Sequence, residues 1–152
     1  MLAELLFAER APLYKKLVIA EQKVETLSGS ADAHVDPNLF TVLARIKKPE
    51  DMAYVEKAIH DEMARVARDG VDDKTLADVL SHVKYNFAAQ LSTPDKTANT
   101  ASTFLALTGD LGSINAYFSL YDKVTSADVK RVAGTIFTPA NRTVVTMKAN
   151  KP

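Results

Sequence analysis

The sequence has no cysteine among its 152 residues. This absence excludes disulfide frameworks, thiolate zinc sites and cysteine nucleophiles, and it leaves the redox compartment open. Glycine is also sparse. The five glycines are scattered along the chain, so no glycine-rich loop is present to cradle a phosphate. A Gly-x-Ser-x-Gly motif is missing as well, and we interpret Ser28-Gly29-Ser30 as an incidental loop sequence.

The chain also lacks an excess of charge of either sign. Its 19 basic and 19 acidic residues give a net charge of +0, so no long-range field attracts it to phosphate backbones or anionic lipid. The opening MLAELLFAER is apolar but short and carries Glu4, Glu9 and Arg10, so we expect neither a signal peptide nor a membrane span. We therefore expect a soluble protein without nucleic-acid or membrane partners, in either the periplasm or the cytoplasm.

The length, a hydrophobic fraction of 47% and a charged fraction of 25% are typical of one globular domain, here residues 1–152. Helical spacing is present in 2–10, and Pro12 suits the first turn of a second helix that ends near Gln22. Alternation then predicts two antiparallel strands, from Lys23 and over 39–46. The second strand is apolar on both faces, so we expect it to be central in its sheet.

The rest of the chain is predominantly helical in pattern. Spacings of three and four predict helices over 52–69, 72–91, 93–109, 114–121 and 125–136. Thr125 and Asp128 have the spacing of a capping box at the start of the last helix. Residues 142–148 alternate again and predict a final strand. The order favours an α+β fold in which a small antiparallel sheet packs against several helices.

Candidate metal or acid–base residues are few because the chain has only three histidines. Glu56 and His60, with Glu62 nearby, could share a helix face, but a solvated face is the preferred interpretation. An exposed ion pair is preferred for two further residues at helical spacing, Asp78 and His82. The loop around His34 also carries Asp32, Asp36 and Asn38, which are ordinary turn residues and lack the spacing of a calcium loop.

Four aromatic residues gather near the middle of the helical region: Phe104, Tyr117, Phe118 and Tyr121. They could form an aromatic platform for a ligand, but ordinary core or helix-packing residues are preferred at this spacing. We therefore assign no catalytic, cofactor-binding or metal-binding residue to the chain.

Two long stretches carry a family resemblance. They are LYKKLVIAEQKVETLSGSADAHVDPNLFTVLARIKKPEDM (13–52) and LTGDLGSINAYFSLYDKVTSADVKRVAGTIFTPANRTVVTM (107–147). They resemble the second half of a domain in the insulinase/pitrilysin family of zinc metallopeptidases, in unbroken order. The resemblance implies that the chain is the C-terminal part of a larger domain. Such domains place a strand before the helix that corresponds to 2–10, so we expect an unpaired sheet edge and self-association through it.

The resemblance also implies where zinc chemistry is expected. Members of the family bind zinc through an inverted His-x-x-Glu-His motif, which this sequence does not contain. Zinc is therefore expected in the full-length protein or a partner domain, with no cofactor on this chain. Active domains of the family also hold substrate with an Arg and a Tyr, and the corresponding positions here are Val18 and Glu25.

These departures lead to two functional hypotheses. The first is a non-catalytic C-terminal portion of an insulinase-like zinc metallopeptidase, which packs against sister peptidase domains or subunits and helps to form the chamber for a peptide substrate. The alternative is a structural or assembly subunit of the same family without peptidase activity. In both, this chain is expected to be inactive alone.

Overall fold

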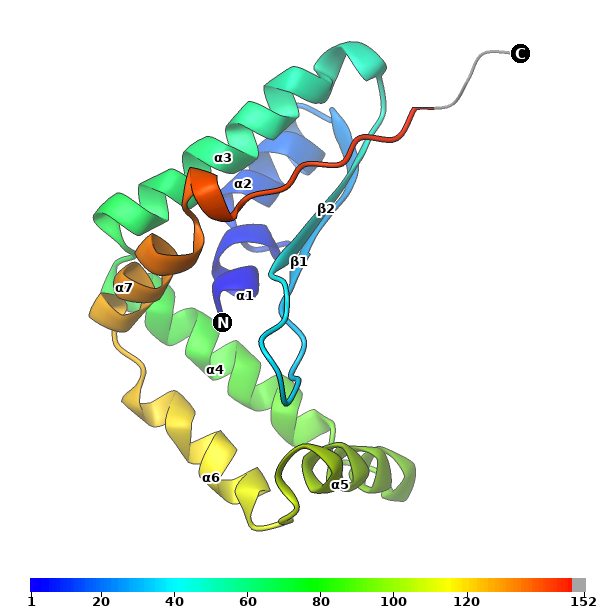
Figure 1. Ribbon diagram of the computed structural model, residues 1–152, viewed down its shortest axis with the longest axis vertical. Helices are drawn as coiled ribbons and strands as arrows, with labels where there is room; N and C mark the ends of the chain where they lie inside the picture. The colour runs from blue at the N-terminus through cyan, green and yellow to red at the C-terminus, as the bar shows by residue number, and fades with distance from the viewer. Residues whose placement is uncertain (149–152) are drawn as a thin grey trace.

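The computed structural model describes residues 1–148 and has an α+β fold, as the sequence predicts (Figure 1). Two strands pair into one small antiparallel sheet, and helices make up most of the remaining chain. Along the chain the main elements are α1 (Leu2–Phe7), α2 (Pro12–Tyr14), β1 (Val24–Ser30), β2 (Thr41–Ile46), α3 (Met52–Asp69), α4 (Asp73–Ala89), α5 (Pro94–Thr108), α6 (Ser113–Leu120) and α7 (Ser126–Ile136).

The sheet has only β1 and β2, paired antiparallel from Val24 opposite Ile46 to Ser30 opposite Thr41. The prediction that the second strand is central is wrong for the described residues, because β2 has a strand on one side only. The exposed face of β2 carries Leu43 between Thr41 and Arg45. One edge of β2 is thus free within residues 1–148.

Ser28-Gly29-Ser30 lies in β1, paired with β2, and not in a loop, which corrects the interpretation from sequence. A Cβ atom added to Gly29 would lie 2.5 Å from Cδ2 of Phe7. Because glycine has no side chain, the Phe7 ring of α1 can lie directly on the strand. Phe7 is 1% exposed, so this contact belongs to the core.

The hydrophobic core lies between the sheet, α1, the segment after Pro12, α3 and α7 (Figure 1). Helix α1 packs on β1, and α3 packs along α7. In each element the buried residues recur at the helical or strand period, so they lie on the face that packs against the core. The buried cluster comprises Leu5, Leu6, Phe7, Leu13, Leu17, Val24, Leu27, Val55, Val66, Leu76, Val129 and Ala133. We call residues 1–71 together with α7 the sheet unit.

Helices α4, α5 and α6 form an arm that extends away from the sheet before α7 returns to α3 (Figure 1). We call residues 73–120 the helical arm. It contributes only Leu76 to the buried core, and neither α5 nor α6 has a fully buried residue. None of the described helices, in the arm or elsewhere, combines the length and apolar character needed to cross a bilayer.

Several helix ends follow the signals in the sequence. The Asp72 side chain caps α4 by accepting from the Thr75 amide at 2.8 Å. Thr125 and Asp128 form the predicted capping box, each satisfying a free amide at the other's position. Gly109 ends α5 with a φ of 72°, a left-handed conformation that glycine adopts without strain.

The final predicted strand does not form: residues 142–148 pair with no strand of the described chain. The segment begins extended at Arg142 and leaves Val145 and Met147 exposed. Alternation alone cannot make a strand, because its backbone groups need a neighbouring strand to hydrogen-bond with.

Candidate functional site

The junction between α2 and β1 has an unusual backbone. Residues Lys15–Ala20 form a π-helix, and the Glu21 amide donates to the Lys16 carbonyl, five residues earlier, at 2.9 Å. Gln22 then adopts a φ of 52°, which is uncommon for a residue with a side chain. Such π-helical turns occur frequently at functional sites, which makes the junction a candidate site.

The two positions identified through the family resemblance lie on either side of this junction. Val18 is in the π-helix and packs against the core. Glu25 lies at a β-bulge, where the register shifts between Val24 and Thr26. The extra residue turns Glu25 outward, and its carboxylate pairs with the Arg45 guanidinium at 3.1 Å. Neither position presents a free cation or a phenol.

A phenol and two cations nevertheless gather at the junction from elsewhere in the chain. The Tyr54 hydroxyl of α3 donates to Glu21 Oε1 at 2.8 Å. The Lys16 and Lys23 ammonium groups lie 5.6 Å and 5.2 Å from the centroid of the Tyr54 ring. Lys23 also bonds to the Asp51 carboxylate, and this hydrogen bond raises the pKa of Lys23.

The charges in this cluster are already matched to one another. Lys16 faces Glu21 at 4.0 Å, and Lys23 faces Asp51. The second oxygen of Glu21 is buried and has no hydrogen-bond partner within the described residues. We interpret the cluster as a polar network that holds α3 against the junction. Spacing in the sequence could not reveal it, because Asp51 and Tyr54 lie about 30 residues after the junction.

The structure does not assemble the candidate metal ligands. His34 lies in the β1–β2 loop, His60 on α3 and His82 on α4. Across residues 1–148, no three His, Asp or Glu side chains lie close enough together to hold a metal ion. His60 is half-buried and not on a fully solvated face, and burial, followed by the charge of Arg142, lowers its pKa.

The expected ion pair between Asp78 and His82 is absent from the contacts of the described chain. His82 Nε2 instead lies 3.1 Å from the amide nitrogen of Asn86, one turn further along α4. Asp32, Asp36 and Asn38 remain in an exposed loop, as turn residues do. The Asn38 side chain accepts from the Leu39 amide at 2.8 Å, which is local turn chemistry.

The aromatic residues of the arm do gather, although they do not form a buried core. Phe87 of α4 is the hub, with its ring centroid 6.2 Å from Phe104, 5.9 Å from Tyr117 and 5.5 Å from Phe118. Tyr117 is still 42% exposed. The helix-packing interpretation is therefore correct for these contacts, but one side of the cluster remains open.

Comparison with known proteins identifies the fold through structure alone. No protein-family profile matches the chain, and no curated protein matches its sequence. A protease from Helicobacter pylori superposes on 92% of the chain with a TM-score of 0.83 and 18% identity. A protein from Bordetella pertussis Tohama I, assigned as a zinc protease, superposes on 93% with a TM-score of 0.77 and 17% identity.

The shared region is only part of the larger proteins. It covers 34% of the Helicobacter protease and 78% of the Bordetella protein. The chain therefore spans about a third of the length of the first. The comparison confirms the fold that the family resemblance implies, an α+β unit found within protease structures.

Proposed function

We propose that this chain is a non-catalytic part of an insulinase-like zinc metallopeptidase and helps to form the wall of its substrate chamber. The observation that carries the proposal is the fold, which matches two protease structures over 92% and 93% of the chain. Peptide hydrolysis would belong to the full-length protein or to the assembly that contains this chain.

The chain's own residues do not fit a zinc site. A catalytic zinc needs three converging protein ligands and a position open to water. The three histidines come from a loop and two different helices, and no ligand cluster forms within residues 1–148. The zinc would therefore be held by a sister peptidase domain or subunit, and we derive no catalytic step on this chain.

The junction between α2 and β1 also supports a structural role, because the side chains at positions 18 and 25 are already engaged within the chain. At Val18 and Glu25 it presents a packed aliphatic side chain and an ion-paired carboxylate. The nearby Tyr54 donates its hydroxyl proton to Glu21, so this phenol is occupied. At positions 18 and 25 the junction therefore offers no guanidinium or phenol to hold a peptide near a metal.

A second candidate function is a structural or assembly subunit of the same family without peptidase activity. The residues at positions 18 and 25 support it equally, because neither is the Arg or Tyr with which active domains of the family hold substrate. The free edge of β2 is where we propose that a sister domain or a second copy adds to the sheet. A chain that stays strictly monomeric by light scattering at high concentration would count against addition of a second copy.

Two measurements test the proposal. The coding sequence upstream of Met1 and the neighbouring genes should encode a His-x-x-Glu-His motif, and its absence from all of them would favour the assembly subunit. The purified chain should contain no stoichiometric zinc and should not cleave a quenched fluorescent peptide. Chelator-sensitive cleavage by the chain alone would overturn the non-catalytic assignment.

A further inference from the structure

The β1–β2 loop reaches the helical arm and closes one side of a pocket. Ala33, His34 and Val35 of the loop face residues of α4, α5 and α6 around a volume of about 620 Å³. This volume is within the range of small-ligand pockets, roughly 300–1,000 Å³. Because loop and arm come from distant parts of the chain, spacing in the sequence does not predict that the loop would meet the aromatic residues of the arm.

The wall of this pocket is aromatic. Phe87, Phe104, Tyr117 and Tyr121 all line it, and the Phe104 and Tyr117 rings meet edge to face with centroids 5.3 Å apart. The Tyr121 hydroxyl donates to the Tyr117 hydroxyl at 3.1 Å. The Tyr117 proton is therefore free to be donated to a ligand.

Apart from the His34 imidazole, the lining of the aromatic pocket carries no acidic or basic side chain. None of its lining residues is Asp, Glu, Lys or Arg. Burial, together with the hydrogen bond to Tyr117, raises the pKa of Tyr121, so this hydroxyl is also neutral near pH 7. An uncharged and bulky apolar group matches such a lining, because a buried charge without a partner would be costly.

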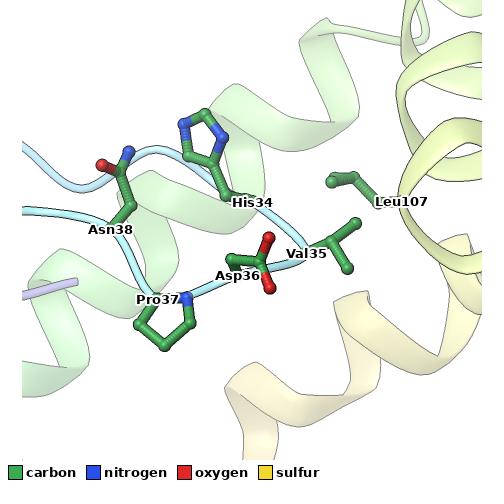
Figure 2. Close-up of a pocket in the computed structure, with 6 residues that line it drawn as sticks. All are labelled: His34, Val35, Asp36, Pro37, Asn38 and Leu107. Carbon is green, nitrogen blue, oxygen red and sulfur yellow. The ribbon is translucent and has the colours of Figure 1, made fainter.

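A second, smaller pocket of about 340 Å³ adjoins the first and shares His34, Val35 and Leu107 with it. Figure 2 shows its lining, with the loop side chains on one side and Leu107 of α5 on the other. The Asp36 carboxylate lines it together with the His34 imidazole, and no Lys or Arg does. The two pockets therefore place an apolar lobe beside a negatively charged one.

We infer that the two lobes bind a peptide in which a bulky apolar residue lies next to a cationic one. The apolar side chain would fill the aromatic lobe, and the cation would face Asp36. Charge complementarity selects the cation, and the aromatic lining selects its neighbour. The choice of a peptide as the occupant rests on the proposed function, whereas the two-lobed chemistry comes from the lining residues.

Binding can be measured directly because the chain contains no tryptophan. The probes are acetyl-Lys-Trp-amide, acetyl-Gln-Trp-amide and acetyl-Glu-Trp-amide, excited where tyrosine does not absorb. Titration of the 152-residue chain should give a saturable blue shift with the Lys peptide. The Gln peptide should bind more weakly, and the Glu peptide most weakly of the three.

Matched variants then test each lobe. Leu107→Gln should weaken the Lys peptide about tenfold, the loss expected for an apolar contact. Leu105→Gln should change it little, because Leu105 is on the same helix, is 52% exposed and lines neither pocket. Val35→Gln gives a second test of the apolar lobe that removes little buried surface, since Val35 is 76% exposed.

Asp36→Asn should weaken the Lys peptide about two- to fivefold and abolish the preference for Lys over Glu. Its control is Asp32→Asn, which changes the same charge in the same loop outside both linings. Circular dichroism of each variant verifies that the arm stays helical.

Three results would overturn the inference: no saturable shift, equal losses from Leu105→Gln and Leu107→Gln, or equal binding of the Lys and Glu peptides. These outcomes are separable from those of the proposed function, which is measured by zinc-dependent cleavage. If the chain binds the Lys peptide but the assembly has no peptidase activity, the pocket is a peptide-binding site in a protein that is not a peptidase. If the assembly cleaves peptide but the chain does not bind the Lys peptide, the inference about the pocket fails and the proposed function stands.

Discussion

The sheet unit and the helical arm are stabilised in different ways. In the sheet unit, Leu17, Val24 and Val55 are 0% exposed and belong to the core between the sheet and the helices of this unit. In the arm, Leu76 alone is fully buried, and aromatic rings that stay partly open to solvent hold α4, α5 and α6 together. Burial of apolar surface is the largest stabilising contribution in folding, so the sheet unit should carry most of the stability.

The difference indicates which part of the molecule can open. Segments with few buried apolar contacts unfold locally at a lower free energy than the core does. The arm also carries exposed Tyr85, Leu91, Leu111 and Leu120. We expect the arm to be the more mobile part and to be the surface that remains available for contacts with other domains.

The largest expected contrast is between a leucine of each region. Leu17→Ala should lower the free energy of unfolding by about 2–5 kcal/mol, because it opens a cavity in a fully packed core. Leu105→Ala removes a side chain that is 52% exposed and should change it by about 0.5 kcal/mol or less. Urea denaturation measures both, and equal effects would contradict the division into two regions.

Phe87→Ala tests whether the aromatic hub holds the arm together. Phe87 contacts Phe104, Tyr117 and Phe118, so its loss should destabilise α5 and α6 by roughly 1–2 kcal/mol. Hydrogen exchange should accelerate over residues 94–120 and remain unchanged in α3. Uniform acceleration across both regions would show that arm and sheet unit unfold together.

The connection between the regions depends on the capping box at the start of α7. Thr125→Ala removes the hydroxyl that accepts from the Asp128 amide and should cost about 1 kcal/mol. Ser102→Ala, in the exposed middle of α5, is the matched control and should be neutral or slightly stabilising. Thermal unfolding compares the two, and indistinguishable midpoints would argue against the cap.

The smallest effect is the alkaline sensitivity of the arm. Burial raises the pKa of Tyr121 above its unfolded value of about 10, so the folded state favours the neutral phenol. Its stabilising contribution is complete below about pH 10 and is lost as the pH rises from there through the higher pKa of the folded state. Tyr121→Phe should therefore flatten the decline in stability above about pH 10. Tyr85→Phe, at a 73% exposed position, should leave the decline unchanged.

Local signals in the sequence predicted the elements well. The capping box at Thr125 and the glycine that ends α5 act through neighbouring residues, so they can be recognised from spacing. The β-bulge at Glu25 was not predicted, because an extra residue in one strand is visible only in the register with its partner. The prediction of a strand over 142–148 is wrong for a related reason. A strand needs a neighbouring strand to pair with, and alternation in the sequence does not show whether one is present.

The candidate sites depend still more on long-range contacts. Tyr54 reaches Glu21 across 33 residues, and Val35 shares a pocket lining with Leu107 across 72. No spacing rule connects such pairs. The expected helix-to-strand junction forms between the π-helix and β1, but the cluster of Lys16, Lys23 and Tyr54 around it depends on contacts with α3 that spacing does not show.

We propose that this chain contributes structure, but no zinc chemistry, to a peptidase. The most direct test is reconstitution with the polypeptide that carries His-x-x-Glu-His upstream or in a neighbouring gene. A quenched fluorescent peptide should be cleaved, in a chelator-sensitive manner, by the two together and by neither alone. Equal cleavage by the zinc-binding partner without this chain, or cleavage by this chain alone, would contradict the account.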